Sequence, residues 1–111
     1  MTKQTDGIWI IDSEGTTLYA NSPMGEILGA DPAELLGKTS FAYVFPEDLE
    51  AAQRLFESKQ HGDVKPFHFR LRRKDGTAIW VDVQGTPMHG MAGEFLGVVG
   101  TFRVPENSQE E

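Results

Sequence analysis

Two stretches of strictly alternating side chains constrain this fold more than any other feature of the sequence. Apolar residues occupy every second position in residues 67–71 (FHFRL) and again in residues 79–84 (IWVDVQ). A period of two is typical of a strand that buries one face. Between the two runs, Asp75 and Gly76 form a pair that favours a tight hairpin turn. The sequence therefore predicts an antiparallel hairpin whose apolar face must be covered.

Three further segments have the composition of strands. Residues 7–12 (GIWIID) and 16–20 flank the turn DSEG, in which Asp12 can bond its own backbone and Gly15 tolerates positive φ. These two runs predict another hairpin, which is the first one along the chain. Residues 95–103 (FLGVVGTFR) predict the last strand.

Helix start and stop signals fill residues 22–62. Ser22, which precedes a proline, has the form of an N-cap, and Gly29 is placed to end that helix. Asp31 and Glu34 have the spacing of a capping box for a second short helix. A longer helix follows, with one apolar stripe formed by Phe45, Leu49, Ala52 and Phe56.

The order of these elements is β-β, helices, β-β-β. The predicted fold class is therefore α+β: an antiparallel sheet with short helices and one longer helix on one face.

The charge and composition limit the kinds of partner. The formal net charge of −7 argues against nucleic-acid binding, which needs clustered Lys and Arg. No apolar run approaches the ~18 residues of a membrane span, and no signal region begins the chain, so a cytoplasmic domain without membrane contact is expected. The absence of cysteine excludes disulfides and thiolate metal sites. One basic run is expected to be a solvated face beside a turn: Arg70, Arg72, Arg73 and Lys74.

Taken together, the segments resemble the PAS family. The matching pieces are GIWIID, LYAN, ELLGK, FPEDL, RRKDGT, IWVDVQGTPM and FLGVVGTF, in that order between Gly7 and Arg103. The resemblance implies a five-stranded antiparallel sheet, with the first two strands at its centre and a cavity beneath the helices. It also implies a PAS domain over residues 7–103, an N-terminal leader over 1–6 and a polar tail over 104–111.

The junction after the last strand departs from the family. PAS domains usually continue there with Asp-(Ile or Val)-Thr toward an output helix, whereas this chain has Val104, Pro105 and Glu106. Proline disfavours continuation of a helix. We therefore expect an atypical or truncated junction.

Matching the strands to the family places one set of side chains beneath the helices. They predict a pocket for a small ligand, although the same side chains could simply pack against each other as a core. Asn21 is expected to cap the first helix, or else to present its amide at the rim of the pocket. The predicted pocket residues are Trp9, Ile11, Asn21, Phe56, Phe69, Leu71, Val81, Val83, Val98 and Phe102.

Some PAS domains bind flavin or haem, and the resemblance allows both to be tested. The positions at which flavin-binding relatives carry amides are Leu71, Val81 and Phe102 here, and the photoreactive cysteine is missing, so flavin is not expected. Haem-binding relatives usually supply a histidine from the long helix, but residues 49–60 contain none. The three scattered histidines do not predict a metal site. The expected cofactor is none, or an unknown small molecule.

The opposite face of the sheet is expected to be apolar as well. A contiguous apolar patch usually marks a contact surface. We therefore expect a homodimer through this outer face, with an interface formed by Ile8, Ile10, Trp80, Phe95 and Val99.

The resemblance implies a sensory or regulatory module rather than an enzyme. It would bind a small ligand, or relay a signal, for an output domain of the same parent protein, such as a histidine kinase of a two-component system. One alternative is a ligand-free dimerisation or docking module, and a less favoured one is a haem-based gas or redox sensor. A small α+β enzyme would need an acid or base among the inward positions, and the pattern places none there.

Overall fold

The two predicted hairpins form the two sides of one antiparallel sheet in the computed structural model, which describes residues 6–105. All neighbouring strands run antiparallel, which confirms the predicted fold class. The leader and tail expected from the sequence lie largely outside the described residues. The strands are β1 (Gly7–Asp12), β2 (Thr17–Ala20), β3 (Phe67–Arg72), β4 (Ala78–His89) and β5 (Phe95–Arg103).

The strand order corrects one expectation. The order is β2-β1-β5-β4-β3, so β5 is the central strand and the first hairpin lies at one side of the sheet, with β2 at the edge. β5 pairs with β1 from Gly7 to Asp12 and with β4 from Asp82 to His89. β2 has only four residues, because Asn21 turns the chain into the first helix.

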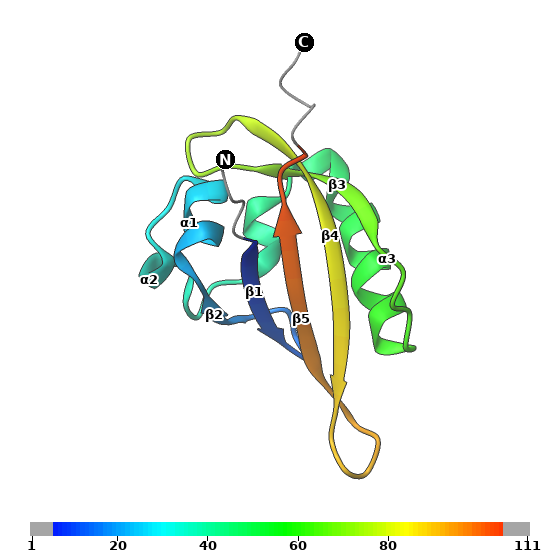
Figure 1. Cartoon of the computed structure of the whole chain (residues 1–111). Coiled ribbons are helices and arrows are strands. Elements are labelled where there is room, and N and C mark those ends of the chain that lie inside the picture. Colours follow the sequence, from blue (N-terminus) through cyan, green and yellow to red (C-terminus); the bar gives the residue numbers. More distant parts are fainter. Residues whose placement is uncertain (1–5, 106–111) are drawn as a thin grey trace.

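Five helical segments cover one face of the sheet, behind the strands in Figure 1. Asn21 caps the first of them, as expected for this residue, whereas Ser22 is the first residue of the helix and not its cap. The Oδ1 of Asn21 accepts hydrogen bonds from the N–H groups of Met24 and Ile8. Gly29 ends this helix in the left-handed conformation, as predicted. The segments are α1 (Ser22–Leu28), α2 (Pro32–Leu35), the 3₁₀ turns η1 (Ser40–Tyr43) and η2 (Pro46–Asp48), and α3 (Leu49–Gln60).

The core is packed most tightly beneath α1 and α2. Met24 and Leu28 of α1 and Leu35 of α2 are completely buried, together with Val81 of β4. α3 contributes smaller or only partly buried apolar residues to the same layer. The two halves of the helical layer therefore differ in how fully they fill the space above the sheet.

The basic run at the β3–β4 hairpin binds the helical layer instead of forming a solvated face. Every one of its side chains reaches a helix or 3₁₀ turn. The hydrogen bonds run from Arg70 Nε to Asp48 Oδ2 (2.9 Å), Arg72 to the carbonyl oxygen of Ala42 (3.0 Å), Arg73 to that of Ile27 (2.9 Å) and Lys74 Nζ to Glu34 Oε1 (2.8 Å).

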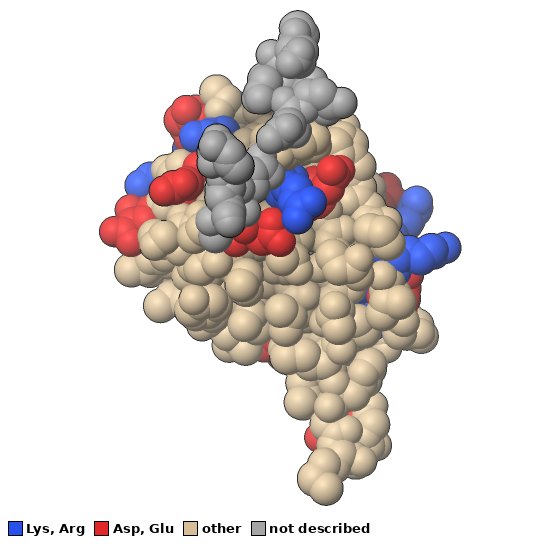
Figure 2. Space-filling view, in the orientation of Figure 1, with Lys and Arg blue, Asp and Glu red and all other residues tan. Residues whose placement is uncertain are grey.

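The exposed face of the sheet carries few charges. Figure 2 shows that Lys, Arg, Asp and Glu gather toward the upper end and one side of this view, while the surface over β1 and β5 is largely uncharged. None of the helices between residues 6 and 105 is long and apolar enough to cross a lipid bilayer.

Candidate functional site: an apolar cavity beneath α3

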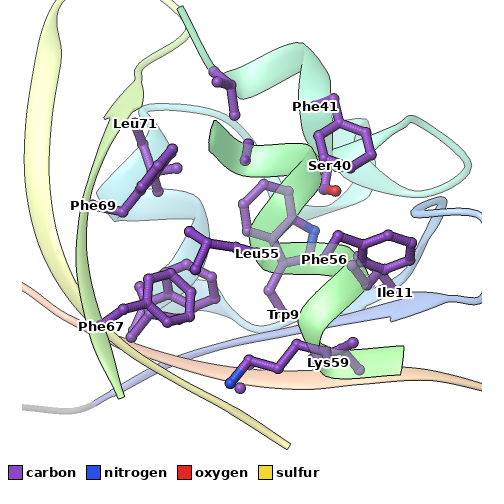
Figure 3. Close-up of a pocket in the computed structure, with 17 residues that line it drawn as sticks. Trp9, Ile11, Ser40, Phe41, Leu55, Phe56, Lys59, Phe67, Phe69 and Leu71 are labelled. Atoms are coloured by element: carbon purple, nitrogen blue, oxygen red, sulfur yellow. The ribbon is translucent and has the colours of Figure 1, made fainter. Parts of the chain in front are cut away.

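A cavity of about 120 Å³ lies between α3 and the sheet (Figure 3). Its walls are almost wholly apolar, and Ser40 and Lys59 are the lining residues with polar side chains. The sheet contributes Trp9, Ile11, Phe67, Phe69, Leu71, Val83, Gly85, Val98, Gly100 and Phe102; the helical layer contributes Ser40, Phe41, Val44, Ala52, Leu55, Phe56 and Lys59.

The volume sets the size of a possible guest. An apolar cavity of about 150 Å³ in another protein stays dry and binds benzene or xenon. A cavity of about 120 Å³ therefore admits a molecule of up to roughly that size before the walls must move.

The structure brings most of the predicted pocket residues together. Two members of the predicted set lie elsewhere. Val81 is completely buried in the core and does not line the cavity, and Asn21 caps α1, with its Nδ2 donating to the carbonyl oxygen of Asp6 (3.3 Å). The predicted residues that do line it are Trp9, Ile11, Phe56, Phe69, Leu71, Val83, Val98 and Phe102.

Trp9 is held in the wall by a buried hydrogen bond. Its Nε1 donates to Oγ1 of Thr17 over 2.9 Å, which joins β1 to β2 across their shared inner face. The indole also packs edge-on against Tyr43 and in a tilted contact against Phe102, with ring centroids 6.0 and 5.6 Å away. These contacts fix one side of the cavity.

Lys59 is the functional candidate that the sequence analysis missed. It lies on α3, three residues after Phe56 and seven after Ala52, so it shares their face of the helix. Its side chain is only 3% exposed. The expectation of no acid or base among the inward-facing residues is therefore wrong.

The ammonium of Lys59 has few partners for a buried charge. Nζ donates one hydrogen bond, to the carbonyl oxygen of Lys65 (3.2 Å), and lies 5.4 Å from the ring centroid of Phe67. Burial away from water lowers the pKa of Lys59, and the negative charge of Asp63 partly offsets that shift.

Two glycines lie side by side on the sheet beneath Lys59. Gly85 of β4 is directly opposite Gly100 of β5, and both line the cavity. A β-carbon at Gly85 would come within 3.1 Å of Cε of Lys59. The absence of a side chain at Gly85 thus leaves room for the lysine to lie against the sheet.

Phe95 is on the opposite face from the one predicted. Its ring packs edge-on against Phe56 of α3, with centroids 5.8 Å apart, so it faces the helices. The simple alternation fails because the register shifts between Met88 and His89, and Gly97 has a positive φ of 147°. Phe95 is therefore removed from the predicted outer interface.

The other residues of the predicted interface lie on the outer face of the sheet. Ile8, Ile10 and Val99 are half-buried. Trp80 is 48% exposed and stacks on His68, with ring centroids 5.0 Å apart. This leaves a partly apolar surface on the side opposite the cavity.

The residues around the cavity do not fit flavin or haem. The lining set contains neither an asparagine or glutamine amide nor an imidazole. Among the described residues, His61 bonds the carbonyl oxygen of Glu57, His68 bonds Asp82, and no cluster of His, Cys, Asp and Glu could hold a metal ion.

Comparison with protein-family models and with curated proteins places this chain among known sequences. The protein-family model described as "PAS fold" matches residues 2–105 of this chain. An uncharacterised protein, y4lL, of Sinorhizobium fredii is 31% identical over 96 residues, covering 84% of this chain and 11% of that protein. The blue light receptor lreA of Aspergillus flavus is 30% identical over 99 residues, covering 88% of this chain and 12% of the receptor.

A solved structure shows the same fold. The PAS domain of a protein from Colwellia psychrerythraea superposes with a TM-score of 0.83 at 21% identity, covering 90% of this chain and 86% of that domain. The chain spans about a tenth of the length of the two curated relatives, 11% of y4lL and 12% of lreA.

Proposed function

The chain belongs to the PAS family, whose members are sensory and signalling modules, and on that premise we propose that it senses a small, largely apolar molecule. The guest would occupy the cavity beneath α3. The observation that supports this is the contrast within one helical layer: the side under α1 and α2 is filled by completely buried residues, while the side under α3 is hollow.

A guest can shift the domain only if it binds one conformation better than another. The sheet and the α1–α2 side are held together by buried residues and by Arg73 and Lys74. The cavity is roofed by η1 and α3, so a guest acts mainly on these elements. Movement of α3 against β4 and β5 would carry the signal to the outer face of the sheet.

The experiment for ligand binding uses a matched pair of variants on α3. Ala52 lines the cavity, while its neighbour Ala51 is exposed. Ala52→Leu is expected to fill the cavity and abolish the amide shifts that xenon or benzene causes in NMR spectra, whereas Ala51→Leu keeps them. Native mass spectrometry of the purified protein, with and without denaturation, would reveal a retained small molecule.

Equal shifts in wild type and Ala52→Leu would place the guest elsewhere and contradict the proposal. The absence of any shift or retained molecule in the wild type would favour the alternative, a ligand-free dimerisation or docking module.

The context of the domain is part of the proposal. Because the chain covers only a small part of its relatives, the signal would pass to an output domain in the parent protein. A histidine kinase of a two-component system in the cytoplasm is the context that we propose, and catalysis would reside there rather than in this domain.

We also propose that the outer face of the sheet forms a homodimer, because the half-exposed Trp80 shares it with Ile8, Ile10 and Val99. Trp80→Glu is expected to convert a wild-type dimer into a monomer in sedimentation equilibrium. Val64→Glu is the control, since Val64 is 55% exposed in the loop before β3. An unchanged dimer mass in Trp80→Glu would rule out this interface.

A further inference from the structure

The ammonium of Lys59 is under-bonded for a charge in an apolar environment. A lysine ammonium carries three donors, and the one hydrogen bond that Lys59 makes among the described residues goes to the carbonyl oxygen of Lys65. Nζ lies 5.4 Å from the ring centroid of Phe67 and 3.6 Å from the place that a β-carbon would take at Gly85, and both of these residues line the cavity. Figure 3 shows the lysine running along the cavity wall toward Phe67.

The protein itself supplies no counter-ion inside the cavity. Its lining set contains no aspartate or glutamate. Asp63 acts on Lys59 only through space, since its Oδ1 accepts a hydrogen bond from the N–H of Lys65 (2.9 Å). A buried charge without a partner is costly, and an anionic guest would supply that partner.

We propose that the cavity binds a small carboxylic acid in its anionic form, with the carboxylate at Lys59 Nζ and an apolar body between Trp9, Leu55 and Phe69. This assignment rests on the proposed sensory function and adds the chemical class of the guest. A charge-assisted hydrogen bond would replace the water that the ammonium has lost. The apolar walls would take a body of about the size of a benzene ring.

The walls also argue against larger or more highly charged anions. A phosphate or dicarboxylate would bring a second charge, and Lys59 is the cation that lines the cavity. The second negative charge would then have only the hydroxyl of Ser40 as a partner, since Ser40 is the other lining residue with a polar side chain. A monocarboxylate leaves no charge unpaired.

The test compares benzoate with its neutral analogues benzamide and toluene, by calorimetry and NMR titration. Wild type is expected to bind benzoate at least tenfold more tightly than benzamide. Lys59→Met keeps the length of the side chain without the charge, and it is expected to lose benzoate affinity at least tenfold while it still binds toluene. Lys65→Met is the matched control, because it removes an exposed lysine whose backbone carbonyl remains.

The outcomes separate this inference from the broader proposal. Toluene binding by Lys59→Met also reports that the variant is folded with an intact cavity. Toluene binding in wild type without any preference for benzoate over benzamide would overturn the assignment to carboxylates and leave the sensory proposal standing. If wild type binds none of the three probes, both proposals fail. The wild-type preference alone decides the matter if Lys59→Met does not fold.

Discussion

Lys59 and Gly85 lie against each other across the space between α3 and β4, so that a β-carbon at residue 85 would be 3.1 Å from Cε of Lys59. The contact joins the buried cation of the cavity wall to β4, the neighbour of the central strand β5. The effects on stability of substitutions at Lys59 and at Gly85 should therefore depend on each other.

Gly85→Ala tests this coupling. The added methyl group must push the lysine away or strain the sheet, and the same β-carbon would meet Cγ1 of Val98 at 3.4 Å. Overpacking of this kind costs about 1–3 kcal/mol. We expect Gly85→Ala to lower the free energy of unfolding by about 1 kcal/mol in wild type and by less than half of that in a Lys59→Ala background, measured by urea denaturation. Equal losses in the two backgrounds would show that the contact carries no energy.

The pH dependence of stability provides a second prediction about Lys59. Burial lowers its pKa in the folded protein below the value of about 10.5 expected for the unfolded chain. The unfolded state therefore binds more protons between the two pKa values, and the contribution of Lys59 to stability rises with pH through that window. Below the folded-state pKa the cost of burying the charge is fully present.

Lys59→Met removes this cost. We expect it to exceed wild type in stability by about 1 kcal/mol at neutral pH, with the difference shrinking as the pH approaches 10.5. Asp63 is the acid that acts on Lys59, while β3 and β4 bring Phe67 and Gly85, which carry no charge. Urea denaturation from pH 7 to 10.5 measures the difference, with Lys65→Met as control. A gap that widened with pH would contradict the sign of the shift.

Thr17→Val should destabilise the fold through Trp9, the cavity-lining residue that Thr17 holds by a hydrogen bond. The hydroxyl of Thr17 is the acceptor for the buried indole N–H of Trp9, and valine would leave that donor unpaired. We expect a loss of about 1–3 kcal/mol in the free energy of unfolding. Thr17→Ser keeps an acceptor in the same place and should retain most of the stability. A Thr17→Val variant as stable as wild type would show that the hydrogen bond contributes no stability, because valine keeps the methyl group of Thr17 and replaces only the hydroxyl.

Arg73→Met should loosen the attachment of α1 to the β3–β4 hairpin. The guanidinium donates to the carbonyl oxygen of Ile27 near the end of α1, 46 residues away in sequence. A loss of about 1–2 kcal/mol is expected, together with faster hydrogen exchange in α1. Arg54→Met is the control, because Arg54 forms an exposed pair with Glu50 on α3, worth about 0.5 kcal/mol or less. Unchanged exchange in α1 would argue that the hairpin does not hold this helix.

The parts of the fold that local patterns govern could be predicted. The alternation in residues 67–71 and the turn at Gly76 predicted the β3–β4 hairpin, and Gly29 ends α1 as expected. Strand order could not be read in this way. β5 pairs with β1 across more than 80 residues of chain, from Gly7 to Phe102, and no local signal specifies such pairing.

The cavity was predicted only in outline for similar reasons. Leu49 was expected in the inward stripe but is 36% exposed, because α3 begins there after a 3₁₀ turn. The sequence does not predict a buried Lys59, because a lysine on an apolar helix face usually extends its ammonium to water. Its spacing from Ala52 and Phe56 was the available signal, and Phe67 belonged to the same alternation as Phe69.

Gly85 and Gly100 limit how the size of the cavity could be changed by mutation. Side chains at Gly85 and Gly100 are already reduced to hydrogen, so nothing can be trimmed there to enlarge the chamber. Variation in guest size must then come from lining positions that carry side chains, such as Leu55, Phe56 and Phe41 of the roof. A library that randomises those roof positions would broaden selectivity, whereas one directed at the two glycines could only close the chamber.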